Sequence, residues 1–463
     1  MTVTYQEFVS SKLTKCQPVG LLEIPALPGS LLPLQSALIP WALKRGRCAI
    51  FADTGLGKSR MEICWAHALH ESLGIDILML TPLAVAKQMI AEAAQIGAPI
   101  TLCRSAADVR PGLNVTNYER LHLFELRRFG AVILDESSCI KHHESRLLQF
   151  LMDAFAETPY KLCASATPAP NDWTELGTHA EFLGVCKRTE MLSEYFVHDG
   201  GETQVWRLKG HAQDHFWEWV ASWAAMVRRP SDLGFDDTLY RLPPLRMHEH
   251  IVASPDQPAG MLLKLEAQTL MERRNARRAT IDQRVAKCVE IVTAEPSEPW
   301  IVWCDLNAEG DALAKNIADA IQVAGSDSID VKESRLEGFA AGQHRVLVSK
   351  SSIAGFGCNW QHCARIAYVG ITDSYESFYQ SLRRCYRFGQ KREVHAHVIA
   401  SDIEGAVLAN LRRKEADASE MSEQLSAKTR SAVMAHVFGN ITTTNEYAPV
   451  KALRIPAWLK TKQ

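Results

Sequence analysis

The chain has 463 residues, of which 47% are hydrophobic and 22% charged, a composition typical of globular proteins with roughly two to four domains. A formal net charge of −2 and a pI near 6.8 exclude a globally basic surface, so any nucleic-acid contact must come from local patches. Twelve cysteines without a CxxC pair argue against a disulfide framework or a zinc ribbon, and no apolar run reaches the roughly 18 residues of a membrane helix. We therefore expect a cytoplasmic protein with no membrane partner.

Short apolar runs alternate with helix-like stretches along the chain. This pattern predicts an α/β fold with parallel sheets covered by helices on both faces. The runs fall into two groups, which predicts two domains in tandem. They lie at 48–52, 75–80, 131–135 and 160–165, and then at 299–305, 344–349, 364–370 and 394–400.

The first run, CAIFA, leads into ADTGLGKS and then into a helical pattern. Gly55 and Gly57 let backbone N–H groups approach phosphates, Lys58 would neutralise β/γ-phosphate oxygens, and Ser59 would ligate Mg²⁺. The first position of the strict P-loop pattern is Ala52 instead of glycine. The strand before the loop and the helix after it favour a nucleotide site, so we expect ATP and Mg²⁺ as cofactors.

The run AVILD at 131–135 ends in two adjacent acids. Asp135 is predicted to hold the Mg²⁺ shell, and Glu136 to orient and deprotonate the attacking water. Ser165 and Thr167, at the end of the next apolar run, can hydrogen-bond this acidic motif and relay the nucleotide state. Together these elements indicate an NTPase.

The stretch from 186 to 265 has few strand signals in its middle and many aromatic residues, so we predict a helical insertion. Its apolar residues at helical spacing are Phe216, Val220, Trp223 and Val227. Packing on a core is the favoured interpretation of the aromatic group. Base stacking by Trp217 or Trp219 stays open.

A long helix is predicted over 265–292, with arginines broadly along one side, Arg273, Arg277 and Arg284. A solvated charged face is the simpler interpretation, and a phosphate-contacting surface is the alternative. Further on, CNWQHC at 358–363 offers two cysteines and a histidine, but its spacing suits no common zinc site, and we expect ordinary side chains there.

The string YQSLRRCYRFGQ places Gln380, Arg384 and Arg387 at Q-x-x-x-R-x-x-R spacing. On a helix this spacing brings the three side chains to one side. Two arginines from a second domain would reach the γ-phosphate when the domains close and stabilise transition-state charge. A surface basic helix is the alternative.

In this order the motifs resemble those of superfamily-two helicases, and more closely the Swi/Snf-like DNA translocases, from about residue 31 to 400. DTGLGKS is similar to DEMGLGKT, LDESSCIKH to DEGHxIKN, SATPAPN to TGTPIQN, and RRCYRFGQ to DRxHRIGQ. Ser138 stands where the family carries histidine. The short stretch between the lobes looks most like the compact helicases encoded by bacteriophages and prophages, which implies a bacterial or phage-infected host cell.

The resemblance assigns further residues. Gln35 and Thr54 join the nucleotide site, together with Gly357 and Gln380. Coupling to nucleic acid is implied for Pro82, Thr116, Tyr118, Lys141, Ser165, Thr167 and Asn359. It also implies two RecA-like lobes, which we place at 26–185 and 266–425, flanked by an N-terminal segment at 1–25 and a tail at 426–463.

The function implied is an ATP-dependent translocase that tracks double-stranded DNA. A strand-separating DNA or RNA helicase is the leading alternative, and an ATP-switched DNA-binding platform without motor activity is a weaker one. A P-loop kinase does not explain the second lobe or RRCYRFGQ.

Overall fold

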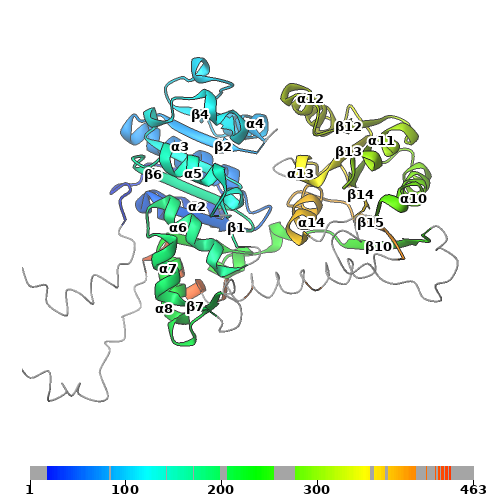
Figure 1. Ribbon diagram of the computed structural model, residues 1–463. Coiled ribbons are helices and arrows are strands. Elements are labelled where there is room, and N and C mark those ends of the chain that lie inside the picture. Colours follow the sequence, from blue (N-terminus) through cyan, green and yellow to red (C-terminus); the bar gives the residue numbers. More distant parts are fainter. Residues whose placement is uncertain are drawn as a thin grey trace, which may run out of the picture.

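The computed structural model describes residues 18–82, 85–141, 143–169, 172–198, 206–254, 277–354, 359–370 and 374–402, and scattered positions from 413 to 439. They form two lobes, each built on a parallel sheet flanked by helices (Figure 1). The predicted α/β fold of two tandem lobes with parallel sheets flanked by helices is confirmed.

The sheet of the first lobe has the order β3-β4-β2-β5-β6-β1-β9 and is parallel throughout. Its strands are β1 (Arg47–Ala52), β2 (Ile77–Thr81), β3 (Ile100–Leu102), β4 (Leu113–Asn117), β5 (Ala131–Asp135), β6 (Tyr160–Ser165) and β9 (Ala224–Val227). Its helices are α2 (Pro33–Arg45), α3 (Lys58–Leu73), α4 (Ala86–Gln95), α5 (Arg146–Ala154), α6 (Leu176–Leu183), α7 (Arg188–Tyr195) and α8 (Gln213–Trp223).

Both faces of this sheet are buried. Successive residues of β1 pack alternately into two separate apolar cores, Phe51 into one and Ile50 into the other. Alternation across a strand produces this arrangement when helices cover both faces. Because the carboxyl ends of parallel strands share one edge, the loops after β1, β5 and β6 come together there.

The stretch expected to be a helical insertion is part of both sheets. β9 pairs in parallel with β1, so it completes the first sheet. Helix α8 ends at Trp223, and Val227 therefore belongs to a strand and not to the predicted helix. Trp217 and Trp219 are buried in the core of the lobe, which favours packing over base stacking. A short antiparallel pair, β7 (Phe196–His198) and β8 (Trp206–Leu208), follows α7.

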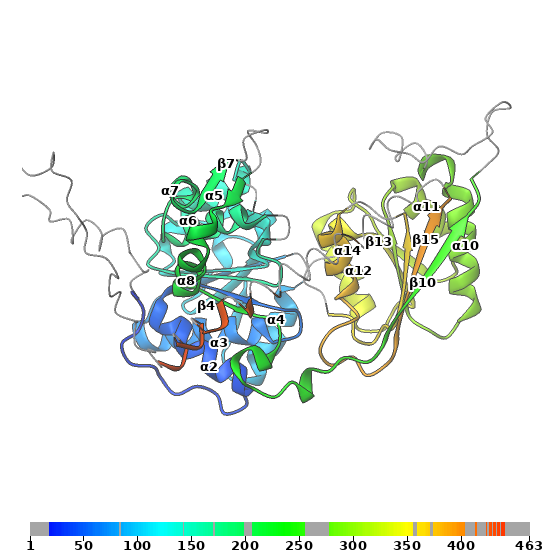
Figure 2. The ribbon, with the colours of Figure 1, turned by 90° about the horizontal axis from the view of Figure 1, so that it is seen from below.

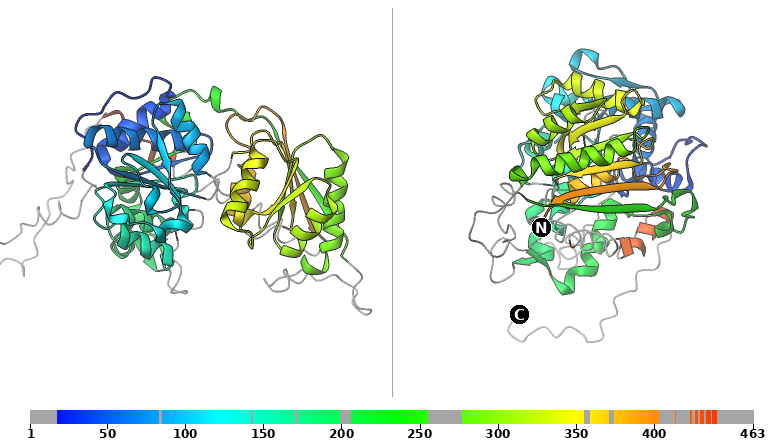
Figure 3. Two further views of the ribbon diagram at one scale, coloured as in Figure 1. Left: turned by 90° about the horizontal axis from the view of Figure 1, so that it is seen from above. Right: turned by 90° about the vertical axis from the view of Figure 1, so that its right-hand side faces the viewer.

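The second sheet has the order β10-β15-β14-β11-β13-β12 and is also parallel. Its strands are β10 (Leu245–Val252), β11 (Trp300–Cys304), β12 (Ala320–Val323), β13 (Val346–Lys350), β14 (Arg365–Val369) and β15 (Val394–Ser401). The helices are α10 (Ile281–Ala294), α11 (Asn307–Asn316), α12 (Ile329–Ala340), α13 (Ser351–Ala354) and α14 (Tyr375–Leu382). Edge strand β10 lies beside β15 and carries the chain in from the first lobe (Figure 3).

Two of the arginines expected on a solvated or phosphate-binding face are buried in ion pairs. Arg284 lies 2.6 Å from Glu309, with both side chains fully buried, and Arg277 lies 2.8 Å from Asp305. A buried arginine needs a carboxylate partner. Arg284 therefore joins α10 to the first turn of α11, and Arg277, before α10, is tied to Asp305, before α11. Arg273 lies outside the described residues.

Helices α12 and α14 lie on the side of the second lobe that faces the first lobe (Figures 1 and 2). Part of the predicted tail docks on the first lobe, because Val433 is buried in one of its cores and Arg430 donates to the Ser231 carbonyl at 3.0 Å. Within the described ranges, none of the helices has the length and apolarity to cross a membrane.

Candidate functional site

The P-loop is a tight turn between β1 and α3. Gly55 and Gly57 adopt left-handed φ values of 93° and 82°, which favour glycine. A Cβ on Gly57 would lie 2.2 Å from Gln35 Nε2, and one on Gly55 would lie 2.7 Å from Phe388 Cβ. A side chain at either position would collide with these neighbours and distort the glycine-rich turn, the predicted phosphate cradle. Lys58 Nζ donates to the Ala52 carbonyl at 2.8 Å at the base of this cradle.

Gln35 fixes one side of the loop. Its Oε1 accepts from the Leu32 N–H at 3.0 Å, and its Nε2 donates to the Leu56 carbonyl at 3.4 Å. The side chain is buried and joins the start of α2 to the glycine-rich turn.

The two acids stand at the carboxyl end of β5. Burial and the neighbouring Glu136 raise the pKa of Asp135 to about 7, although Lys58 and Arg384 oppose the shift. Glu136 has a φ of 54°, a left-handed conformation that costs a residue with a side chain on the order of 1–2 kcal/mol. Strained backbone of this kind is found mainly at functional sites, where the surrounding structure holds the residue in that conformation.

A chain of hydrogen bonds leads from Glu136 to the second lobe. Ser165 Oγ donates to Glu136 Oε2 at 3.3 Å, and the Thr167 N–H donates to Ser165 Oγ at 3.1 Å. Gln380 Nε2 donates to Thr167 Oγ1 at 3.2 Å. Gln380 was expected at the nucleotide, but the structure places its amide against the first lobe, where it connects the two lobes.

The two arginines follow α14 instead of lying on it, because the helix ends at Leu382. The predicted helical spacing is therefore wrong, and a turn brings the side chains to the cavity. Arg384 Nε donates to the Gln380 carbonyl at 3.0 Å, and its Nη2 lies 4.0 Å from Glu136 Oε1.

Arg387 has the environment of an anion-binding group. Its Nε is buried and has no hydrogen-bond partner among the described residues. Burial and the neighbouring Arg384 lower the pKa of Arg387 to about 10. A phosphate oxygen would satisfy this nitrogen and offset both effects.

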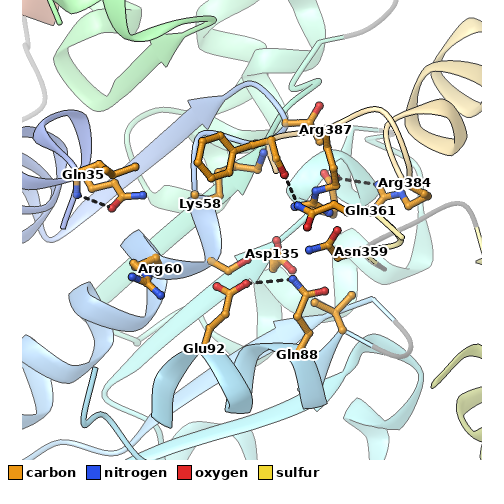
Figure 4. A pocket seen from close by; sticks show the side chains of 18 of the residues that line it. Gln35, Lys58, Arg60, Gln88, Glu92, Asp135, Asn359, Gln361, Arg384 and Arg387 are labelled. Atoms are coloured by element: carbon orange, nitrogen blue, oxygen red, sulfur yellow. Dashed lines mark hydrogen bonds and ion pairs between the residues drawn. The ribbon is translucent and has the colours of Figure 1, made fainter. Parts of the chain in front are cut away.

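These groups line one cavity of about 360 Å³ between the lobes (Figure 4). Residues predicted for the site line it from both lobes: Gln35, Thr54, Gly55, Gly57, Lys58, Ser59, Asp135, Glu136, Asn359, Arg384 and Arg387. The volume lies within the range of small-ligand sites. The glycine-rich turn, the buried acids and Arg387, whose Nε has no hydrogen-bond partner among the described residues, fit a nucleoside triphosphate with Mg²⁺.

Several lining residues were not anticipated: Leu32, Arg60, Val85, Gln88, Glu92, Gln95, Gln361 and Phe388. Gln88 and Glu92 are hydrogen-bonded across one turn of α4, and Arg60 Nη2 donates to Gln95 at 2.9 Å. The placement of Arg60 on α3 and of Gln88, Glu92 and Gln95 on α4 depends on the packing of these two helices, which no local sequence pattern reveals.

Asp53 is a further contact between the lobes that the sequence did not reveal. Its Oδ1 accepts from Tyr379 Oη at 2.6 Å and from the Thr54 N–H at 2.6 Å. Arg383 Nη2 lies 3.8 Å from Asp53 Oδ2 and stacks over the Tyr379 ring. The conformation of the P-loop is thus tied directly to the segment that carries the two arginines.

The other predicted coupling residues lie apart from this cavity. Tyr118 Oη donates to the Asp135 backbone carbonyl at 2.8 Å, so it holds the backbone of the acidic motif in position. Pro82 and Thr116 line a small pocket nearer to α12, and Lys141 lines a third one beside Arg188. Gly357 lies outside the described residues. Within the described ranges, no group of three or more His, Cys, Asp or Glu side chains is arranged to hold a metal ion by itself.

The fold and this cavity define a two-lobed α/β protein with a nucleotide-type site between its lobes. Residues 32–176 match the family model described as DEAD/DEAH box helicase. A search of curated proteins finds no match. Among solved structures, the chain is similar to the Sulfolobus solfataricus SWI2/SNF2 ATPase core in complex with dsDNA, with 15% identity and a TM-score of 0.41 over 90% of this chain and 98% of that one.

Proposed function

We propose that the protein is a nucleic-acid-dependent ATPase that couples hydrolysis in the cavity between its lobes to movement along double-stranded DNA. The observation that carries the proposal is the meeting of Glu136 from the first lobe with Arg384 and Arg387 from the second in one cavity. The match of residues 32–176 to helicases supports it.

In this mechanism the P-loop N–H groups and Lys58 hold the β- and γ-phosphates. Asp135 and Ser59 would hold Mg²⁺, which when bound neutralises phosphate charge. Glu136, oriented by Ser165, accepts a proton from the attacking water. Arg384 and Arg387 offset the charge that develops on the γ-phosphate, so that hydrolysis requires the second lobe to be in place.

Movement along DNA would follow from the requirement that the second lobe be in place for hydrolysis. The two lobes touch through Asp53 with Tyr379 and through Thr167 with Gln380, contacts that a change of nucleotide state would alter. Alternating closure and opening would advance two grips on the strand. The preference for duplex DNA rests on the likeness of RRCYRFGQ to the Swi/Snf-like string, and the compact layout leads us to propose a bacteriophage or prophage source.

The test is ATP hydrolysis with duplex DNA, single-stranded DNA and RNA, for the wild type and for Glu136→Gln. We expect duplex DNA to stimulate the wild type most and the substitution to abolish turnover. The motor proposal is wrong if no polymer accelerates hydrolysis. Full ATPase activity in Lys58→Ala would contradict the assignment of the nucleotide site.

Strand separation is a second candidate because the structure contains an antiparallel pair outside the sheets. β7 and β8 pair at the edge of the first lobe, where Trp206 is half-buried against the core and its ring lies 3.6 Å from that of His198. An aromatic side chain on such a strand pair can stack against bases and separate them. Unwinding of a forked duplex that Trp206→Ala abolishes would favour this function, whereas displacement of a triplex strand without unwinding favours translocation.

A further inference from the structure

Helix α12 presents a row of acids to the first lobe. Asp330, Glu333 and Glu337 lie three and four residues apart and so share one face of the helix. Glu337 Oε2 is 2.6 Å from Lys87 Nζ. Asp330 and Glu333 lie 3.4 Å and 3.8 Å from Arg120 Nη2. All three carboxylates of α12 are therefore paired with cations of the first lobe.

The first-lobe surface beneath α12 has unsatisfied polar groups. Thr116 Oγ1 and Asn117 Oδ1, at the end of β4, are buried and have no hydrogen-bond partner among the described residues. They line a pocket together with Pro82, Lys87 and Arg120 from the first lobe and Glu333 and Glu337 from α12. Lys87, Arg120 and the Thr116 hydroxyl can all donate to phosphate oxygens, so this surface is suited to a phosphate group.

No phosphodiester fits there while α12 stays in place. The space that remains is about 20 Å³, roughly the room that one water molecule needs. Along the helix axis the three acidic residues are separated by about 4.5 and 6 Å. They therefore present a row of closely spaced negative charges to Lys87 and Arg120.

We infer that α12 is an internal phosphate mimic that covers a backbone-binding surface formed by Lys87, Arg120 and Thr116, and that a nucleic-acid strand competes with it for these residues. This inference rests on the proposed function, because it assumes that a nucleic acid is the ligand. The inference adds to the proposed function that Lys87 and Arg120 bind the nucleic-acid backbone. It also adds that their ion pairs with α12 limit the affinity of the protein for nucleic acid.

The contact is suited to displacement. Glu337 and Lys87 remain partly exposed, and exposed ion pairs stabilise little. Burial raises the pKa of Glu333 although Arg120 and Arg104 oppose the shift, so the lobes hold this carboxylate at a cost. A polyanion with several phosphates can therefore replace α12.

The experiment compares binding of a short labelled duplex DNA by fluorescence anisotropy in the wild type and in D330N/E333Q/E337Q. Removing the mimic should tighten binding about five- to tenfold, because strand and helix no longer compete. The control D153N/E157Q/E218Q removes three exposed acids elsewhere in the first lobe and should change affinity less than about twofold.

Lys87→Ala and Arg120→Ala test the surface itself. Each should weaken binding and lower the slope of log Kd against log salt by about 1, as expected when one phosphate contact is lost. A melting temperature near that of the wild type shows that each variant is folded.

Equal tightening in the α12 variant and its control would overturn the inference, since net charge would then explain the effect. Unchanged affinity in the α12 variant would also overturn it and leave the proposed function standing. If neither wild type nor variants bind or respond to any polynucleotide, the proposed function fails and the inference fails with it.

Discussion

At the scale of single residues, the P-loop glycines show how two lobes constrain one position. Gly55 is limited by its left-handed backbone and also by Phe388 of the second lobe, whose backbone nitrogen would lie 2.9 Å from an added Cβ. Gly74, at the end of α3, has a left-handed φ of 66° but no neighbour within 4 Å of an added Cβ. Substitutions at Gly55 and Gly74 therefore allow the effect of backbone strain to be compared with the effect of strain plus steric collision.

Gly55→Ala should lower the apparent affinity for ATP by about tenfold or more, because the cradle distorts or the second lobe is pushed away. Gly74→Ala carries the backbone cost alone, about 1 kcal/mol of unfolding free energy, and should keep its ATPase. Nucleotide titration and urea unfolding of both variants check this. Equal losses of ATP affinity in the two would show that strain, and not the Phe388 contact, limits Gly55.

At the scale of elements, β10 and β15 share a column of histidines. His248 Nε2 lies 2.9 Å from His395 Nδ1, and His250 Nε2 lies 3.0 Å from His397 Nδ1. The rings of His248 and His397 stack at 4.6 Å. Each close nitrogen pair needs one nitrogen without a proton, so the column holds only while its members are largely neutral.

This column predicts a loss of stability in acid. Burial, followed by the three neighbouring histidines and Arg365, lowers the pKa of His397 to about 3. A lowered histidine pKa contributes stability above the unfolded value of about 6.5, and that stability is lost as pH falls from there toward 3. With Lys287 and Glu290 of α10 beside His250, the groups facing the column are mixed in charge.

For His397, which is partly exposed so that solvent screening reduces the effect, we expect the unfolding free energy to fall by roughly 1 kcal/mol between pH 6.5 and 5. His397→Phe keeps a ring against Trp300 but cannot take up a proton, so its urea-unfolding profile should be flatter over this range. His215→Phe, at an exposed position, is the control and should keep the wild-type slope. An unchanged slope in His397→Phe would contradict the role of the column.

The elements also show where sequence reasoning worked. Strands such as AVILD at β5 and WIVWC at β11 are buried on both faces, and their continuous apolar runs predict them directly. β9 was missed because its residues AAMV follow a longer aromatic helix, and only pairing with β1 makes them a strand. The end of α14 was misplaced because the Q-x-x-x-R-x-x-R spacing also suits a turn that follows a helix.

At the scale of the whole molecule, the candidate site was predicted best where its residues are adjacent in sequence. The P-loop and the Asp135–Glu136 pair are local patterns, and both line the cavity. The contact of Asp53 with Tyr379 joins residues more than 300 positions apart, and the pairing of α12 with Lys87 and Arg120 depends on how the lobes meet. Such contacts have no local signal.

The cavity belongs to neither lobe alone. The first lobe supplies the cradle and the acids, and the second supplies Arg384, Arg387 and Asn359. If these arginines act on the γ-phosphate, their removal affects turnover much more than nucleotide binding, because charge builds there mainly in the transition state.

The most direct measurement is the steady-state rate of ATP hydrolysis by Arg387→Ala with saturating duplex DNA, together with its affinity for ATP. A catalytic site shared between the lobes predicts that kcat falls about 10³-fold or more, while ATP binding by the first lobe changes much less. A kcat within about threefold of the wild type would contradict a shared site and with it the central claim.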